Sequence, residues 1–340
     1  MGRTRRGARL ARLAALALAV AMLATGCSSE GVKQPSTPTH DSTGHTWLSG
    51  VWLGGATSTR EVRAFGRWRG SKVDTLTTYP AYESWQELSR SDWHVSTFNG
   101  FRGRLSYGLP LLPKEDGGSL RDVASGARDD VWRSVARTLV RYDRGDSFVR
   151  VGLEANGTWF PWGATAEAAD DFKAAYRQVV RVMSSIAPNL VFVFDISCGV
   201  ALEGAEDDRL ASLTRLYPGN DVVDVVGCDH YDSWSAMARD EGEWEDSISP
   251  SSGPGLTDVV EFARENGKRF AVPEWGLSSK DAHGAGDNEF FIHKMYEFFR
   301  ANRDVLAFEN YFDEPDQYLG SSLFLKKQNP DSAEVYRELW

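Results

Sequence analysis

Short apolar runs recur along this chain with helical patterns between them, and this alternation constrains the fold more than any other feature. Parallel strands need long crossovers between them, and eight such strands can close into a barrel. The eight predicted strands are Val51–Gly54, Val73–Thr78, Leu105–Leu111, Phe148–Leu153, Val191–Asp195, Val222–Cys228, Arg269–Pro273 and Val305–Tyr311. The alternation therefore predicts an α/β chain with a (β/α)8 TIM barrel over residues 46–340.

Apolar residues spaced three or four apart predict the crossover helices. The clearest pattern covers residues 166–186, and weaker ones cover 131–142, 256–266, 288–301 and 332–339. An open doubly wound sheet is the competing architecture. No GxGxxG or GxxxxGK loop follows any predicted strand, so nothing favours the nucleotide site that such sheets commonly carry.

The first 45 residues differ in composition from the rest. Residues 1–27 hold five arginines and no acid, then an apolar stretch too short to span a bilayer, and end in Cys27 after small residues. This pattern predicts an export signal with lipidation of Cys27, so that a lipid anchors the protein to the outer face of the cell membrane; simple secretion is the second choice. Residues 28–45 are rich in Ser, Thr and Pro and predict a flexible tether.

The composition excludes some partners. The formal net charge is −10, and it becomes −15 once the five arginines of the signal are removed. An acidic domain is poorly suited to nucleic acid, whereas a neutral polysaccharide is compatible with it. Twelve tryptophans are available for the core or for stacking on sugars. No histidine spacing predicts a metal site, and neither a cofactor nor an oligomer is expected.

Two cysteines remain after the signal. Cys198 and Cys228 fall near the ends of two predicted strands that would be neighbours in the barrel. Outside the cytoplasm they could pair, but two buried free thiols would give the same sequence pattern, so both alternatives stay open.

Two glutamates suggest the chemistry. Glu154 and Glu274 each follow an apolar run and stand close to tryptophan, 120 residues apart in the chain. The C-terminal ends of barrel strands carry the active site in this fold, and a pair of carboxylates is the minimum for cleaving a glycosidic bond. An ionised Glu274 would raise the pKa of Glu154 and keep it protonated as the acid.

Three segments together resemble glycoside hydrolase family 26. They are Glu154–Gly163, with the letters EANGTWFPWG, Tyr217–Tyr231, and Pro273–Gly276. The resemblance spans roughly residues 50–315 and implies a retaining β-glycosidase on a (β/α)8 barrel, with β-mannan as the commonest substrate. It also implies Glu154 as acid/base, Glu274 as nucleophile, Trp159 as a sugar-stacking ring and Tyr231 as a partner of the nucleophile.

Further residues are expected to line the sugar site because they lie at strand ends. These are Asn156, Trp162, Asp229, His230, Trp275 and Tyr311. Asn156 could instead tie down the turn before Gly157, and those two roles are equally open. Asp195 is expected to be held by hydrogen bonds rather than to react.

Two departures from the family pattern bear on the substrate. Leu153 stands where the family usually has His, and the eighth strand ends in Asn310-Tyr311-Phe312 where many members have Trp. Both predict an altered substrate. The alternatives are an inactive carbohydrate-binding barrel, and a tethered hydrolase that trims the cell's own exopolysaccharide.

Overall fold

Eight parallel strands form a closed barrel in chain order, as the sequence predicts. The structure is a computed structural model that describes residues 46–56, 58–90 and 92–340. The predicted signal, Cys27 and the predicted tether lie outside these residues. The strands are β1 Leu48–Leu53, β2 Thr75–Thr78, β3 Arg104–Leu109, β4 Phe148–Val151, β5 Val191–Ser197, β6 Val225–Tyr231, β7 Arg269–Gly276 and β8 Leu306–Asp313.

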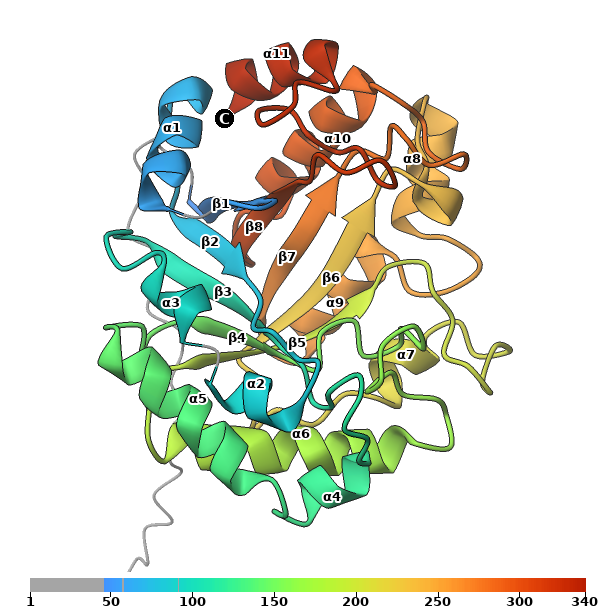
Figure 1. Cartoon of the computed structure of the whole chain (residues 1–340). Helices are drawn as coiled ribbons and strands as arrows, with labels where there is room; N and C mark the ends of the chain where they lie inside the picture. The colour runs from blue at the N-terminus through green and yellow to red at the C-terminus, as the bar shows by residue number, and fades with distance from the viewer. Residues whose placement is uncertain (1–45, 57, 91) are drawn as a thin grey trace, which may run out of the picture. The chain divides into compact units, whose positions relative to one another are not determined.

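Helices follow the strands and surround the barrel (Figure 1). They are α1 Thr59–Arg69, α2 Trp85–Arg90, α3 Trp93–Ser96, α4 Leu120–Ala124, α5 Asp129–Arg141, α6 Ala169–Ser184, α7 Ala211–Thr214, η1 Trp234–Ala236, α8 Glu241–Ile248, α9 Leu256–Glu265, α10 Glu289–Ala301 and α11 Pro330–Leu339. Helices α1 and α11 lie side by side, close to where β1 pairs with β8 and closes the barrel. None of the helices in the described ranges has the length and hydropathy that a membrane span requires.

Two apolar clusters fill the two layers of the fold. The larger lies between the barrel and its helices, where Phe172, Tyr176 and Met183 of α6 are fully buried. The smaller contains Phe148 and Phe308, whose ring centroids are 4.3 Å apart. This smaller cluster belongs to the strands themselves, since its members come from β4 to β8 with Leu48 of β1 packed against them. Burying such side chains contributes about 1.5–3 kcal/mol each.

The strand ends differ from the prediction where polar groups intervene. Strand β6 begins at Val225 rather than Val222, because Asp224 accepts a hydrogen bond from the Phe192 amide through its side chain and donates its own amide to the Phe192 carbonyl. Strand β7 continues to Gly276 and so contains Glu274, whereas Glu154 lies three residues beyond the end of β4. The two glutamates therefore have different backbone settings.

Candidate active site

The Glu274 carboxylate receives hydrogen bonds from three side chains. The Tyr79 hydroxyl and the Arg150 guanidinium donate to Oε1, both over 2.5 Å, and the Tyr231 hydroxyl donates to Oε2 over 2.8 Å. These donors come from the end of β2, from β4 and from β6. Donors on both oxygens fix the direction of the carboxylate and surround it with positive charge and dipoles.

Arg150 binds three carboxylates inside the barrel. Besides Glu274, it donates to Asp195 through Nε over 3.0 Å and through Nη2 over 2.5 Å, and Nη2 also donates to Asp229. The Arg150, Asp195 and Asp229 side chains are fully buried. Burial raises the pKa of Asp229 well above its usual value, against the lowering effect of Arg150. The cluster is a buried charge network that depends on Arg150.

Glu154 lies in a tight turn after β4. Its φ is 48°, in the left-handed region that only a few non-glycine residues adopt, and its carbonyl accepts the Gly157 amide over 2.7 Å. The Trp159 indole donates to Glu154 Oε2 over 3.0 Å. No other side chain in the described residues donates a hydrogen bond to this carboxyl group, whereas Glu274 has three such donors.

The environment of Glu154 favours its protonated form. Burial raises its pKa to about 8, and the negative charge of Glu274 adds to the rise. Arg150 and the hydrogen bond from Trp159 lower this pKa but do not cancel the rise. A carboxyl group with this pKa holds a proton at neutral pH and can deliver it to a leaving group.

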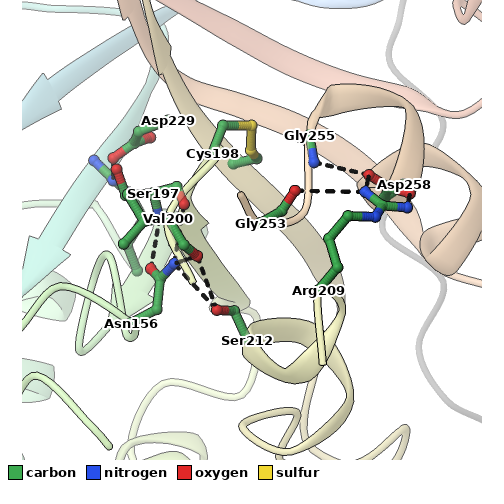
Figure 2. The surroundings of a disulfide bond; sticks show 12 residues. Asn156, Ser197, Cys198, Val200, Arg209, Ser212, Asp229, Gly253, Gly255 and Asp258 are labelled. Carbon is green, nitrogen blue, oxygen red and sulfur yellow. Dashed lines mark hydrogen bonds and ion pairs between the residues drawn. A yellow bond between two sulfur atoms is a disulfide. The ribbon is translucent and has the colours of Figure 1, made fainter. Parts of the chain in front are cut away.

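Asn156 anchors the turn that carries Glu154. Its amide nitrogen donates to the carbonyls of Ser197 and Val200, over 3.0 and 2.9 Å, and its oxygen accepts the Ser197 amide over 2.8 Å. Figure 2 shows Asn156 facing this segment beside Cys198, which forms a disulfide with Cys228. The pairing alternative left open by the sequence is thus resolved in favour of a disulfide. Of the two roles considered for Asn156, these contacts support the one that ties down the turn.

One cavity brings the two glutamates together. It has a volume of about 230 Å³. Its lining residues are Tyr79, Tyr82, Pro110, Leu153, Glu154, Phe160, Trp162, Glu274 and Phe312. Both predicted catalytic carboxylates therefore face one space at the C-terminal end of the barrel, where this fold places its chemistry.

The predicted aromatic residues occupy different places. The Trp159 ring is 57% exposed beside Glu154, so more than half of this side chain is accessible to a ligand. The Trp162 ring lines the cavity but is almost fully buried, stacks on Phe160 at 4.5 Å and donates to the Leu153 carbonyl. Trp52, at the end of β1, stacks on Phe312 and meets the edge of Tyr79 with centroids 5.0 Å apart. It is only partly buried.

Three other predicted sugar-site residues are buried on the outer side of the strands. Trp275 is fully buried against Trp340 and Phe291. His230 stacks on Phe291, and Tyr311 packs on Trp275 and donates its hydroxyl to the Ser321 carbonyl. Neighbouring residues on a strand point to opposite faces of the sheet. The outward direction of these three side chains therefore follows from the inward direction of the residues next to them, such as Glu274 and Tyr231. Contact with a bound sugar would require them to leave the core.

Sequence reasoning missed Arg150 and Tyr79. The signal for Arg150 was a lone cation inside the apolar run Phe148-Val149-Arg150-Val151. A charge buried in a strand needs partners, and strand-end carboxylates were the obvious ones. Tyr79 follows β2 and gave no comparable signal, because a tyrosine at a strand end is as often structural.

Gly108 of β3 makes room for Tyr79. A Cβ at position 108 would lie 2.5 Å from Cδ1 of the Tyr79 ring and 3.6 Å from Cδ1 of Leu153. The Tyr79 ring therefore lies directly against the backbone of β3. Since its hydroxyl bonds Glu274, this close approach sets one of the three donors of the site.

Histidines and acids in the described residues do not assemble into a metal site. No group of three or more His, Cys, Asp or Glu side chains in this part of the chain has the arrangement to hold an ion. His94 accepts the Ala81 amide through Nε2, and burial lowers its pKa to about 4, so it is neutral.

Comparison with known proteins identifies the segment that carries Arg150, Glu154 and Tyr231. Residues 147–270 match the model of Glycosyl hydrolase family 26. Glu274 lies four residues beyond this match. Over this segment the chain is similar to members of that family, and one curated relative is a mannanase by name.

Two curated relatives illustrate the similarity. The mannan endo-1,4-beta-mannosidase of Bifidobacterium adolescentis is 30% identical over 177 residues, 49% of this chain and 17% of that protein. Endoglucanase H of Acetivibrio thermocellus is 23% identical over 201 residues, 58% of this chain and 21% of that protein. This chain thus spans about a fifth or less of these relatives.

The fold agrees with a solved structure over most of the chain. The catalytic domain of the family 26 endo-beta-1,4-mannanase of Bacillus sp. JAMB-750 has a TM-score of 0.62 and 17% sequence identity, covering 85% of each chain. At this identity the likeness establishes the (β/α)8 barrel.

Proposed function

We propose that this chain is a retaining, endo-acting glycoside hydrolase that cleaves a β-mannan or a related β-linked glycan by double displacement. The observation that carries the proposal is the contrast between two carboxyl groups on one cavity. Glu154 has a pKa raised to about 8, while Glu274 is bonded by two tyrosines and an arginine. The segment match and the mannanase relatives support this choice of substrate class.

In the first step Glu154 protonates the glycosidic oxygen as Glu274 attacks the anomeric carbon. The bond to the leaving group breaks, and a covalent glycosyl-enzyme forms on Glu274. The negative charge of Glu274, which contributed to the raised pKa of Glu154, is then gone, and the pKa of Glu154 falls. Glu154 left its proton on the departing alcohol in the first step, so it is ionised and serves as base for water in the second step.

The remaining residues position these groups. Arg150, Tyr79 and Tyr231 hold the nucleophile, and Asn156 holds the turn of the acid/base. Trp159 offers an exposed ring beside Glu154 on which a sugar could stack. Phe312 supplies an aromatic surface at the end of β8. No step requires a metal or a cofactor.

The test is hydrolysis of β-mannan, mixed-linkage β-glucan and β-1,3-xylan by the folded protein. We expect mannan fragments of several lengths, and the first product seen by ¹H NMR should keep the β configuration. An α product would overturn the double displacement. Tight oligosaccharide binding measured by calorimetry, with no product over days, would instead indicate a carbohydrate-binding barrel.

We further propose that the chain is exported and anchored through a lipid on Cys27. The support is the pattern of residues 1–27, together with the Cys198–Cys228 disulfide, since such bonds persist in oxidising compartments. Mass spectrometry of the membrane fraction should detect a diacylglyceryl group on Cys27. A Cys27→Ser variant found equally in that fraction would contradict the anchor.

A further inference from the structure

Five lining residues of the cavity that holds the two glutamates offer few polar atoms to a sugar. They are Tyr82, Pro110, Leu153, Phe160 and Trp162, which we call the apolar wall. The wall adjoins the acid/base, because Leu153 directly precedes Glu154 and both line the cavity. Substrate atoms that meet Leu153, Pro110 or Phe160 therefore pack against carbon.

The wall is a fixed surface. The Phe160 and Trp162 rings are stacked at 4.5 Å with planes 9° apart, and Tyr82 meets Trp162 at 5.5 Å in an edge-on contact. The Trp162 indole donates to the Leu153 carbonyl over 2.9 Å, which joins the ring to the turn of Glu154. Leu153 and Pro110 are buried. Its side chains therefore have little freedom to move aside for a polar ligand.

Few hydrogen-bonding atoms remain on the wall. The Trp162 N–H is already used, and the other side-chain polar atom is the Tyr82 hydroxyl. Lys114, which lies over the Tyr82 ring at 4.7 Å, is paired with Glu83 over 2.7 Å. The hydroxyl of Tyr79, which also lines the cavity, is bonded to Glu274. A sugar hydroxyl turned toward Leu153, Pro110 or Phe160 would lose its water partners and find no replacement.

We propose that the cavity selects a β-linked sugar carrying a methyl-bearing group beside Leu153, either an O-acetyl ester or a 6-deoxy carbon, in place of a free hydroxyl. This inference rests on the proposed hydrolase function and names the substrate feature that the site reads. Apolar surface of the substrate gains by leaving water for this wall, whereas a hydroxyl loses. Leu153 is the specificity-determining residue because it is the wall residue adjacent to the acid/base.

The experiment measures kcat/KM on matched substrates. In the ester arm, an O-acetylated glucomannan is compared with the same polymer after mild alkaline de-esterification. In the deoxy arm, an aryl β-mannoside is compared with the aryl β-glycoside of 6-deoxymannose. We expect a preference of about tenfold or more for the methyl-bearing member of at least one pair, and the arm that shows it identifies the group.

Two variants test the role of Leu153. L153H places a polar ring on the wall and should reduce the preference toward equality or reverse it. L153M keeps an apolar side chain of similar volume and should keep the preference. Thermal unfolding of both variants shows whether they fold. If L153H does not fold, the ratio of kcat/KM for the two members of each pair, measured on the wild type, tests the inference by itself.

The outcomes separate this inference from the proposed function. Equal cleavage of both members of each pair by the wild type overturns the inference and leaves the hydrolase intact. If no substrate is cleaved, the proposed function fails, and calorimetry with acetylated and de-esterified manno-oligosaccharides decides about the wall. Tighter binding of the acetylated form then supports the selectivity, and equal binding overturns it.

Discussion

Glu274 and Glu154 face the same cavity but are held in opposite ways. Glu274 lies inside strand β7 with donors on both oxygens, whereas Glu154 lies in a left-handed turn with one indole donor. A nucleophile must keep one direction and carry negative charge. An acid/base must gain and lose a proton, which is easier in a place with few donors. The local structures suit these two tasks.

The largest expected effect separates the two carboxyl groups by their products. Replacing Glu274 with Gln should lower kcat on the order of 10⁴- to 10⁶-fold, because no covalent intermediate can form. With azide and an aryl glycoside, Glu274→Ala should yield an inverted α-glycosyl azide, while Glu154→Ala should yield the retained β form. The exposed Glu265→Gln in α9 serves as control and should match the wild type. The same azide anomer from both alanine variants would show that the roles are not distinct.

The next effect concerns the support of Glu274. Replacing Arg150 with Met leaves Asp195, Asp229 and Glu274 without their shared cation and should lower the free energy of unfolding by about 3–5 kcal/mol. As a control, Arg264→Met removes a partly exposed pair with Asp304 and should cost under about 1 kcal/mol. Urea denaturation measures both. Similar losses in the two variants would mean that the buried cluster contributes no more to the free energy of unfolding than the partly exposed pair.

A pH profile tests the protonation of Glu154. Because its folded pKa is raised to about 8, kcat/KM should fall as the pH rises through about 8, when the acid loses its proton. The raised pKa also means that the folded state holds a proton that the unfolded chain releases near pH 4.5. The free energy of unfolding should therefore decline from about pH 4.5 to about 8, and this decline should be smaller in Glu154→Gln.

Glu274 contributes to that raised pKa, which gives a second observable for the same comparison. In Glu274→Gln the like charge is gone, so the pKa of Glu154 should fall, as ¹³C NMR of the labelled carboxyl group would show. An unchanged value would contradict the coupling of the two groups.

The smallest expected effect comes from the single donor to Glu154. Trp159→Phe keeps an exposed ring but removes the indole N–H, whose hydrogen bond lowers the pKa of Glu154. The alkaline limb of the pH profile should move upward, with a loss in kcat of at most about tenfold, the worth of one neutral hydrogen bond. Trp234→Phe is the matched control, since that exposed ring stacks on His283. A downward shift in Trp159→Phe would contradict the assigned contact.

Sequence reasoning predicted the barrel well because its signal is repeated. Eight apolar runs and their helical spacers must agree with one another, so small errors at individual ends, such as Val222 instead of Val225, do not change the topology. The glutamates were found from their position after apolar runs, and the structure places both on one cavity.

The surroundings of the glutamates were harder to predict, because they depend on the direction of each side chain. Because neighbouring side chains on a strand alternate in direction, inward Glu274 and Tyr231 predict that Trp275 and His230 point outward. Arg150 could also have been inferred from its apolar neighbours. By contrast, nothing local marked Tyr79 as a donor, since its contact with Glu274 joins residues 195 positions apart.

Gly108, which has no Cβ, links two parts of the sequence, the end of β2 and strand β3. Alanine at position 108, near the end of β3, would displace the Tyr79 ring and remove a donor from Glu274. Positions 79 and 108 should therefore covary among relatives, with glycine kept wherever an aromatic residue ends β2. A sequence search could use positions 79 and 108, rather than the glutamates alone, to recognise chains that orient their nucleophile in this way.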